Sequence, residues 1–202
     1  MSRDKSPAPG SQSLDAAYFD ALYAREGDPW RFATSPYEAE KYARTVAALP
    51  RARYRSGLEV GCSIGVLTSL LANRCDALMS VDVADTALAQ ARARNHNRPN
   101  VQFARARLPE DCPAGPFDLV VLSEVLYYFS RTDLARLAGS VERVADSSAE
   151  VILVHWLGPT PDYPLSGDEA AETFIRSMQS SADVSHQDRQ DGYRLDLLRL
   201  NP

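Results

Sequence analysis

Apolar residues recur every three or four positions over the first part of the chain. This spacing predicts one helix over 14–26 and a second over 35–49. Ser35 can cap the second helix, a proline follows it at the first helical position, and Glu38 can complete a capping box. Residues 1–13 offer almost nothing apolar to bury, so we expect them to form a disordered tail.

From residue 56 onward, short apolar runs alternate with helical spacings. Strands are expected over 58–60, 77–81, 101–103, 117–122, 151–154, 183–189 and 193–200, with helices over 66–71, 85–96, 130–144 and 168–178. The run 117–122 is almost continuously apolar, which is typical of a strand buried on both faces. Asp85 and Ser130 are expected to cap their helices, and Asp191-Gly192 predicts a hairpin between the last two strands.

This alternation predicts a single α/β domain over 14–202. We expect a Rossmann-like, mostly parallel sheet of seven strands with an antiparallel C-terminal hairpin strand and helices on both faces. Residues 14–50 would form an N-terminal helical lid, and 56–202 the core. A ligand site is expected at the carboxyl ends of the strands, where the strand order reverses.

The chain has 202 residues, 45% of them apolar and 24% charged, which suits one domain with a full hydrophobic core. Its formal net charge of -5 argues against a nucleic-acid partner, because surfaces that bind phosphates are rich in Lys and Arg. No apolar run is long enough for membrane insertion and no signal peptide is evident, so we expect a cytoplasmic protein. The three cysteines form no CxxC pair, so neither a disulfide framework nor a metal site is expected. These features leave the oligomeric state open.

The segment Glu59-x-Gly61-x-Ser63-x-Gly65 lies where a predicted strand runs into a predicted helix. Small residues here let the backbone approach a ligand closely, and the start of the helix favours a carboxylate or phosphate. Asp82, 21 residues after Gly61, ends the next strand and can accept hydrogen bonds from ribose hydroxyls. A glycine turn followed by an unrelated acid is the alternative. Strand, turn, helix, strand and acid nevertheless occur in the order that a nucleotide site requires.

The glycine spacing bears on which cofactor this turn binds. A dinucleotide fingerprint needs G-x-G-x-x-G, and the segment lacks the second and third of those glycines. It instead resembles motif I of class I methyltransferases, E/D-x-G-x-G-x-G, with Ser63 in place of the middle glycine. The resemblance implies S-adenosyl-L-methionine as the cofactor, with its methionine part on the turn and its ribose on Asp82. The acid that many members carry after the third strand is absent, so backbone groups near Ala106 or Leu108 are expected to contact the adenine.

Several longer segments resemble the NodS family of nodulation N-methyltransferases. They are residues 28–38 with Lys41-Tyr42, 61–68, 122–128, 155–156 and 162–168. The resemblance covers nearly the whole chain after the tail. It implies methylation of the free amine of a deacetylated glucosamine in a chitooligosaccharide.

Amine methylation depends mainly on positioning, although an ammonium must first lose a proton, so a nearby carboxylate or base would help. Glu124 and His155 are the catalytic candidates, because they end the fourth and fifth strands and should lie at the open edge of the sheet. A surface or helix-start acid is the alternative for Glu124, and a hydrogen-bonded strand-end histidine is the alternative for His155.

Aromatic residues and one lysine are candidates for the acceptor site or its lid. Trp30, Tyr37 and Lys41 precede the core and could cover the cofactor and the acceptor. Tyr127 could stack on a sugar, and Trp156 directly follows His155. Core packing for the aromatic rings, a purely structural helix pair and a solvated Lys41 are the alternatives.

Three other functions stay open on these observations. The same fold could methylate another small-molecule amine or hydroxyl, because a fold by itself does not identify a substrate. A nucleotide-dependent oxidoreductase is disfavoured by the missing glycines of the dinucleotide fingerprint. A non-catalytic binding module is disfavoured by the intact Glu59, Gly61, Gly65 and Asp82.

Overall fold

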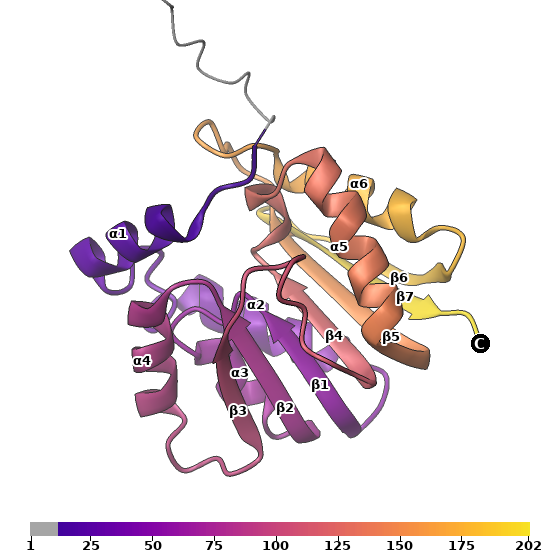
Figure 1. Ribbon diagram of the computed structural model, residues 1–202, viewed down its shortest axis with the longest axis horizontal. Helices are drawn as coiled ribbons and strands as arrows, with labels where there is room; N and C mark the ends of the chain where they lie inside the picture. The colour runs from indigo at the N-terminus through magenta and orange to yellow at the C-terminus, as the bar shows by residue number, and fades with distance from the viewer. Residues whose placement is uncertain (1–11) are drawn as a thin grey trace, which may run out of the picture.

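The computed structural model describes residues 12–202 and contains one seven-stranded sheet with helices around it (Figure 1). The strands are β1 (Tyr54–Val60), β2 (Cys75–Asp82), β3 (Val101–Arg105), β4 (Phe117–Ser123), β5 (Ala145–Trp156), β6 (Ala182–Arg189) and β7 (Tyr193–Leu200). The helices are α1 (Ala16–Glu26), α2 (Pro36–Ala47), α3 (Val66–Leu71), α4 (Asp85–Arg94), α5 (Arg131–Val144), α6 (Gly167–Met178) and the short 3-10 helix η1 (Leu126–Tyr128).

The strands lie in the order β3-β2-β1-β4-β5-β7-β6. Neighbours from β3 to β5 pair in parallel, whereas β7 pairs antiparallel with both β5 and β6. The predicted Rossmann-like architecture and its C-terminal hairpin are confirmed. The strand order reverses between β1 and β4, which makes their carboxyl ends the topological switch point where such sheets bind ligands.

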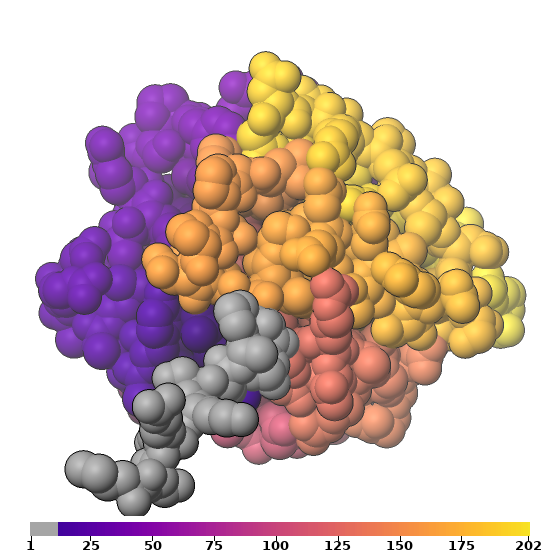
Figure 2. Space-filling view, turned by 90° about the horizontal axis from the view of Figure 1, so that it is seen from above, coloured from indigo at the N-terminus to yellow at the C-terminus, as the bar shows by residue number. Residues whose placement is uncertain are grey.

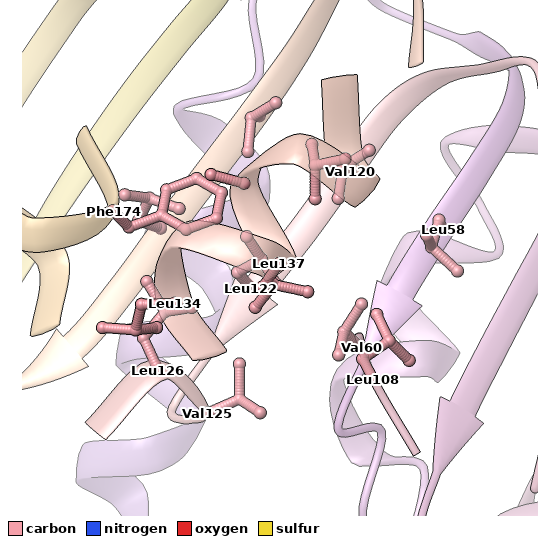
Figure 3. Packing of buried hydrophobic residues seen from close by; sticks show 14 of the residues in the cluster. Leu58, Val60, Leu108, Val120, Leu122, Val125, Leu126, Leu134, Leu137 and Phe174 are labelled. Carbon is pink, nitrogen blue, oxygen red and sulfur yellow. The ribbon is translucent and has the colours of Figure 1, made fainter. Parts of the chain in front are cut away.

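Alternating side chains of β4 enter two separate hydrophobic clusters. Val120 and Leu122 pack with Leu134, Leu137 and Phe174 of α5 and α6 (Figure 3). On the opposite face, residues of β4 pack with α2 and α3; these residues are Leu119 and Val121 from β4, Tyr42 from α2, and Leu67 and Leu71 from α3. The prediction of a strand buried on both faces is therefore confirmed, as are helices on both faces of the sheet.

Several predicted helix starts differ in detail from the structure. The first helix begins at Ala16 with Asp15 as its cap, rather than at residue 14. Asp85 is not a cap: Ala84 occupies that position, because the nearby Asp82 carboxylate already accepts the Ala84 N–H at 2.9 Å. Ser130 caps α5 as predicted.

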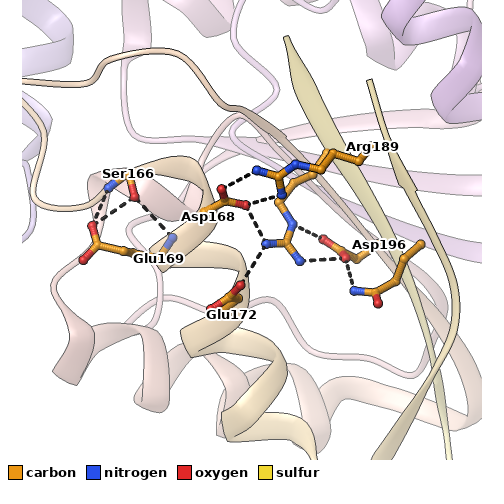
Figure 4. Close-up of polar contacts among 8 residues, drawn as sticks. Ser166, Asp168, Glu169, Glu172, Arg189 and Asp196 are labelled. Atoms are coloured by element: carbon orange, nitrogen blue, oxygen red, sulfur yellow. Dashed lines mark hydrogen bonds and ion pairs between the residues drawn. The ribbon is translucent and has the colours of Figure 1, made fainter. Parts of the chain in front are cut away.

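The predicted capping box at α2 is incomplete. Ser35 accepts the Glu38 N–H at 3.4 Å, so the expected cap is present. The Glu38 carboxylate does not return to Ser35 and instead pairs with Lys41. A complete capping box occurs at α6, between Ser166 and Glu169 (Figure 4).

Ion pairs hold the C-terminal hairpin against α6 (Figure 4). Arg194 of β7 is only 7% exposed and donates to Asp196 on the same strand at 2.8 and 3.0 Å. The same guanidinium donates to Asp168 at the start of α6 at 2.8 Å, and Arg189 of β6 binds Asp168 as well. Gln187 donates to Asp196 at 2.6 Å, which completes the hairpin cluster of Arg194, Asp196, Asp168, Arg189 and Gln187.

The predicted tail lies outside the described residues except for its last two positions. Ser13 is tied to the start of α5, since its hydroxyl donates to Asp133 at 2.6 Å and accepts the Ser130 N–H at 2.9 Å. No helix within residues 12–202 is both long and apolar enough to cross a membrane.

Candidate active site

A cavity with about 1130 Å³ of empty space, its open mouth included, lies at the carboxyl ends of β1, β2 and β4. It is thus located at the topological switch point, as expected for this sheet. Of the candidate site residues predicted from the sequence, those in its wall are Trp30, Glu59, Gly61, Ser63, Asp82, Ala106, Leu108 and Glu124. In the space-filling view of Figure 2, purple residues of the N-terminal helices border orange residues that follow β5.

The turn after β1 runs through left-handed backbone conformations. Gly61, Ser63 and Gly65 have φ angles of 73°, 51° and 77°. A Cβ at Gly65 would lie 2.9 Å from the Ala91 backbone, so this glycine permits close packing of α4 and does not itself line the cavity. Ser63 adopts a conformation that favours glycine, and its N–H donates to Asp82 at 2.8 Å, which helps to hold the turn.

Two buried carboxylates face this turn. Asp82 accepts the backbone N–H groups of Ser63 and Ala84, at 2.8 and 2.9 Å. Burial raises the pKa of Asp82, while those N–H groups favour its charged form. Glu59 accepts the Thr68 and Ser80 hydroxyls at 2.6 and 2.7 Å, and burial raises its pKa to about 7. Asp82 therefore provides a carboxylate in the cavity wall, and Glu59 stabilises the turn through its hydrogen bonds with Thr68 and Ser80.

Glu124 follows β4 with a φ angle of 54°, and three donors hold its carboxylate in the cavity wall. The Lys41 ammonium donates to Oε1, while the Tyr127 hydroxyl at 2.6 Å and the Trp156 N–H at 3.0 Å donate to Oε2. Burial acts against the charge of Glu124, but the Lys41 ammonium, His155 and the hydrogen bonds from Lys41 and Tyr127 together outweigh it, and the pKa is lowered. Glu124 is consequently an anion at neutral pH.

His155 lies behind this group and does not line the cavity. Its ring is fully buried, and Nε2 accepts the Leu126 N–H at 3.1 Å. Burial lowers the pKa of His155 to about 4, so the ring is neutral at pH 7 with its proton on Nδ1. That Nδ1 has no hydrogen-bond partner among residues 12–202. The structure thus separates the two catalytic candidates: Glu124 faces the cavity, and His155 supports the turn after β4.

The five acceptor and lid candidates also differ in whether they line the cavity. Trp30 lines the cavity and stacks on Phe32, with ring centroids 5.4 Å apart. Lys41 and Tyr127 are buried against Glu124, outside the cavity wall. Tyr37 and Trp156 are more than a third exposed and pack edge to face at 5.9 Å.

Sequence reasoning missed the part that α1 takes in this site. Tyr23 lines the cavity, and its hydroxyl donates to the Ser63 hydroxyl at 2.6 Å. Phe19, from the preceding turn of α1, lines it as well. The helical spacing of apolar residues predicts the helix that carries both rings, but it contains no signal for which ligand site that helix borders.

The cavity has polar groups suited to a nucleoside-type cofactor with an amino-acid moiety. Asp82 can accept from ribose hydroxyls, and the turn from Gly61 to Gly65 brings bare backbone to the cavity. The Ser123 hydroxyl also lines the cavity and is buried without a hydrogen-bond partner among residues 12–202. Such an unpaired buried group is costly unless a ligand completes its hydrogen bonds.

Comparison with known proteins then decides the family. A family model described as Nodulation protein S (NodS) matches residues 20–151. The chain belongs to the NodS family. The predicted resemblance is therefore confirmed.

Curated members of the NodS family cover only part of the chain. Nodulation protein S of Bradyrhizobium diazoefficiens is 36% identical over 102 residues, which are 50% of this chain and 49% of the relative. Nodulation protein S of Sinorhizobium fredii is 31% identical over 123 residues, or 60% of this chain and 56% of the relative. The chain thus spans about half the length of the curated relatives it matches.

A solved NodS structure shares the fold over a greater length. It is the N-methyltransferase NodS from Bradyrhizobium japonicum WM9 in complex with S-adenosyl-L-homocysteine. It matches with a TM-score of 0.79 over 94% of this chain and 100% of that chain, at 21% identity. The seven-stranded architecture is therefore that of the methyltransferase fold.

Proposed function

We propose that this NodS-family chain is an S-adenosyl-L-methionine-dependent N-methyltransferase. The observation that carries the proposal is a single cavity that joins the Gly61–Gly65 turn and Asp82 with the Glu124 carboxylate. The related NodS structure, solved with S-adenosyl-L-homocysteine, supports the choice of cofactor. The proposed acceptor is the free amine of a deacetylated glucosamine in a chitooligosaccharide, in keeping with the NodS family.

When bound, S-adenosyl-L-methionine supplies an electrophilic methyl group on a sulfonium centre. We assign the ribose to Asp82, the methionine part to the turn from Gly61 to Gly65, and the adenine to the backbone near Leu108. Tyr23, Phe19 and Trp30 line the cavity, and we assign them the part of limiting the access of water to the bound cofactor. In this proposal residues 14–50 form the lid and 56–202 the core of a cytoplasmic enzyme.

Glu124 is the residue to which we assign the acceptor amine. Its lowered pKa makes it a weak base, so its main contribution is to bind and orient the amine through a charge-assisted hydrogen bond. Positioning of this kind provides most of the acceleration in a transfer that needs no covalent help. The amine reaches its neutral, nucleophilic form by releasing a proton to water at the cavity mouth.

The decisive experiment combines cofactor binding with methyl transfer. Calorimetric titration with S-adenosyl-L-homocysteine should show one site, and Asp82→Asn should weaken binding by about tenfold, as loss of a charged hydrogen-bond partner does. Addition of S-adenosyl-L-methionine and a chitooligosaccharide deacetylated at its non-reducing end should then yield the N-methylated product by mass spectrometry.

The results separate the parts of the proposal. Transfer to the deacetylated oligosaccharide and none to the fully acetylated one would support the aminosugar. Cofactor binding with transfer only to another amine or hydroxyl would keep the methyltransferase and replace the acceptor. Absence of cofactor binding would refute the proposal.

A further inference from the structure

Lys41 is a buried cation shared by two carboxylates. Its side chain is 2% exposed, and Nζ lies 3.0 Å from Glu38 Oε1 and 2.9 Å from Glu38 Oε2 while donating to Glu124 Oε1. Glu38 itself is 9% exposed. The cluster of Lys41, Glu38 and Glu124 is called the α2 cluster below, because two of its members lie on that helix.

Burial of a lone lysine favours its neutral form, but the two carboxylates reverse that effect. The pKa of Lys41 is raised: burial opposes the charge, and Glu124 and Glu38 together more than offset it. Lys41 is therefore charged. Burial raises the pKa of Glu38, although the Lys41 ammonium opposes that rise. When both carboxylates are ionised, the α2 cluster carries one uncompensated negative charge next to the cavity.

The other groups that face Glu124 carry no positive charge at neutral pH. Tyr127 from η1 and the Trp156 N–H from β5 are neutral donors. His155 of β5 is a neutral ring, and the Tyr37 ring of α2 lies 5.3 Å from Lys41 Nζ. Among the described residues facing Glu124, Lys41 is thus the cation that favours its ionised form.

We propose that Lys41 is a positioning residue, which holds Glu124 ionised and aimed at the cavity, and that Glu38 leaves the α2 cluster with a net negative charge that selects a cationic amine as the acceptor. The inference rests on the proposed function for its acceptor, though its electrostatic part is independent of it. Helix α2 would then be part of the site and more than a cover over the sheet. Lys41 and Glu124 are far apart in the chain, and only packing of α2 beside the end of β4 joins them.

The direct test is a titration of Glu124 that needs no acceptor. Carbon-13 NMR of protein labelled at the glutamate carboxyl carbon, with the signal assigned through Glu124→Gln, should show Glu124 ionising below the usual range for glutamate. In Lys41→Met the midpoint should rise by about one to three pH units, the usual effect of removing an opposite charge at contact distance. Lys41→Arg should restore most of the wild-type value.

Matched variants separate charge from folding. Arg44→Met removes a cation from the same helix, but its pair with Glu40 is exposed, so the Glu124 titration should stay unchanged. Glu38→Gln keeps the Lys41–Glu124 pair and should not raise the Glu124 midpoint. Thermal unfolding and S-adenosyl-L-homocysteine binding identify any variant that fails to fold.

Kinetics with the deacetylated chitooligosaccharide test the selection of a cation. In Lys41→Met the acid limb of the kcat/KM profile should move upward together with the NMR midpoint. Glu38→Gln should raise KM by about fivefold, as expected for removal of one nearby charge in a partly screened site, with kcat retained.

A Glu124 midpoint in Lys41→Met within about half a pH unit of wild type would overturn the inference. So would an unchanged KM in Glu38→Gln. If the midpoint rises as expected but the wild type methylates no amine, the proposed function fails while the electrostatic role of Lys41 is supported.

Discussion

Two buried ion-pair clusters in this molecule have similar chemistry and different surroundings. In the α2 cluster, Lys41 pairs with Glu38 and Glu124 beside the large cavity. In the hairpin cluster, Arg194 pairs with Asp196 and Asp168 between β7 and α6 (Figure 4). Each joins segments distant in the chain, and each has a neutral side chain that donates to its central carboxylate at 2.6 Å.

The difference lies in what each carboxylate can still bind. Asp196 is 1% exposed, accepts two hydrogen bonds from Arg194 and one from Gln187, and borders no described cavity. Glu124 faces the cavity and has a left-handed backbone that directs it there. Burial and ion pairing alone therefore do not distinguish the two carboxylates, whereas access to the cavity does. The comparison predicts activity effects at one cluster and stability effects at the other.

The largest expected effect is on turnover. Glu124→Gln should lower the rate of methyl transfer by about 100-fold or more, because the acceptor loses its charged partner. S-adenosyl-L-homocysteine binding should change little, since the turn and Asp82 are intact. Asp196→Asn is the matched variant of the hairpin cluster, and its turnover per folded molecule should stay within a few-fold of wild type. Equal losses in both variants would contradict the assignment.

A large stability effect is expected at the hairpin cluster. Arg194→Met leaves the buried Asp196 without its cation, which should lower the free energy of unfolding by about 3 kcal/mol or more. Arg189→Met removes an exposed partner of Asp168 and should cost less than about 1 kcal/mol. Urea unfolding measures both variants. A loss in Arg189→Met as large as in Arg194→Met would show that burial of the pair is unimportant here.

His155 lies opposite Arg194 in the sheet and close to Glu124, so it reports on both clusters. Its folded pKa of about 4 lies below the value of about 6.5 expected when unfolded. The unfolded chain thus binds more protons between these values, and the stability that the neutral ring contributes is present above pH 6.5 and lost as the pH falls toward 4. The loss is about 3 kcal/mol.

The contribution of His155 to stability has to be measured as a difference between wild type and a His155 variant, because another buried group titrates in the same pH range. Glu59 has a pKa raised to about 7, so its protonation increases the free energy of unfolding of the protein as the pH falls over much of the same range. Urea unfolding from pH 7 to 4 should therefore be compared between wild type and His155→Gln. The wild type should lose about 3 kcal/mol more than the variant over that interval. Parallel pH profiles would contradict a neutral buried His155.

The smallest effect concerns the neutral donors of the two clusters. Tyr127→Phe removes a hydrogen bond to Glu124 and should lower turnover by about tenfold, as expected for a bond to a charged group. Gln187→Met removes the equivalent bond to Asp196 and should leave turnover unchanged. Steady-state kinetics measures turnover in both variants. A loss of turnover in Gln187→Met similar to that in Tyr127→Phe would contradict the proposed difference between the two clusters.

Most of the fold was predictable because it depends on local patterns. The continuous apolar run of β4, the Asp191-Gly192 turn and the helical spacing of α5 each describe a few neighbouring residues. Errors occurred where two partners competed for one group. Asp85 does not cap α4, since Asp82 already accepts the first free N–H, and Glu38 leaves its capping box for Lys41.

The cofactor end of the site was also readable from local spacing. Glu59, Gly61, Ser63 and Asp82 lie on one strand–turn–helix–strand unit, and that unit brings them to the cavity. The positions of the candidate acceptor residues, Glu124 and His155, could not be predicted from local spacing in the same way. His155 lies near the end of β5 and Glu124 follows β4, yet the pleat and the turn after β4 direct one side chain behind η1 and the other into the cavity.

By itself, then, the sequence determined the alternation of strands and helices, the nucleotide-type turn and the acid that follows it, because periodicity and turn chemistry act over short stretches of chain. Only the tertiary structure decided that Tyr23 reaches Ser63, that Lys41 pairs with Glu124 and that Arg194 is enclosed with Asp196 and Asp168. These contacts depend on how α1, α2 and α6 pack on the sheet. The apolar spacing of a helix specifies which of its faces is buried, but not which distant side chain that face meets.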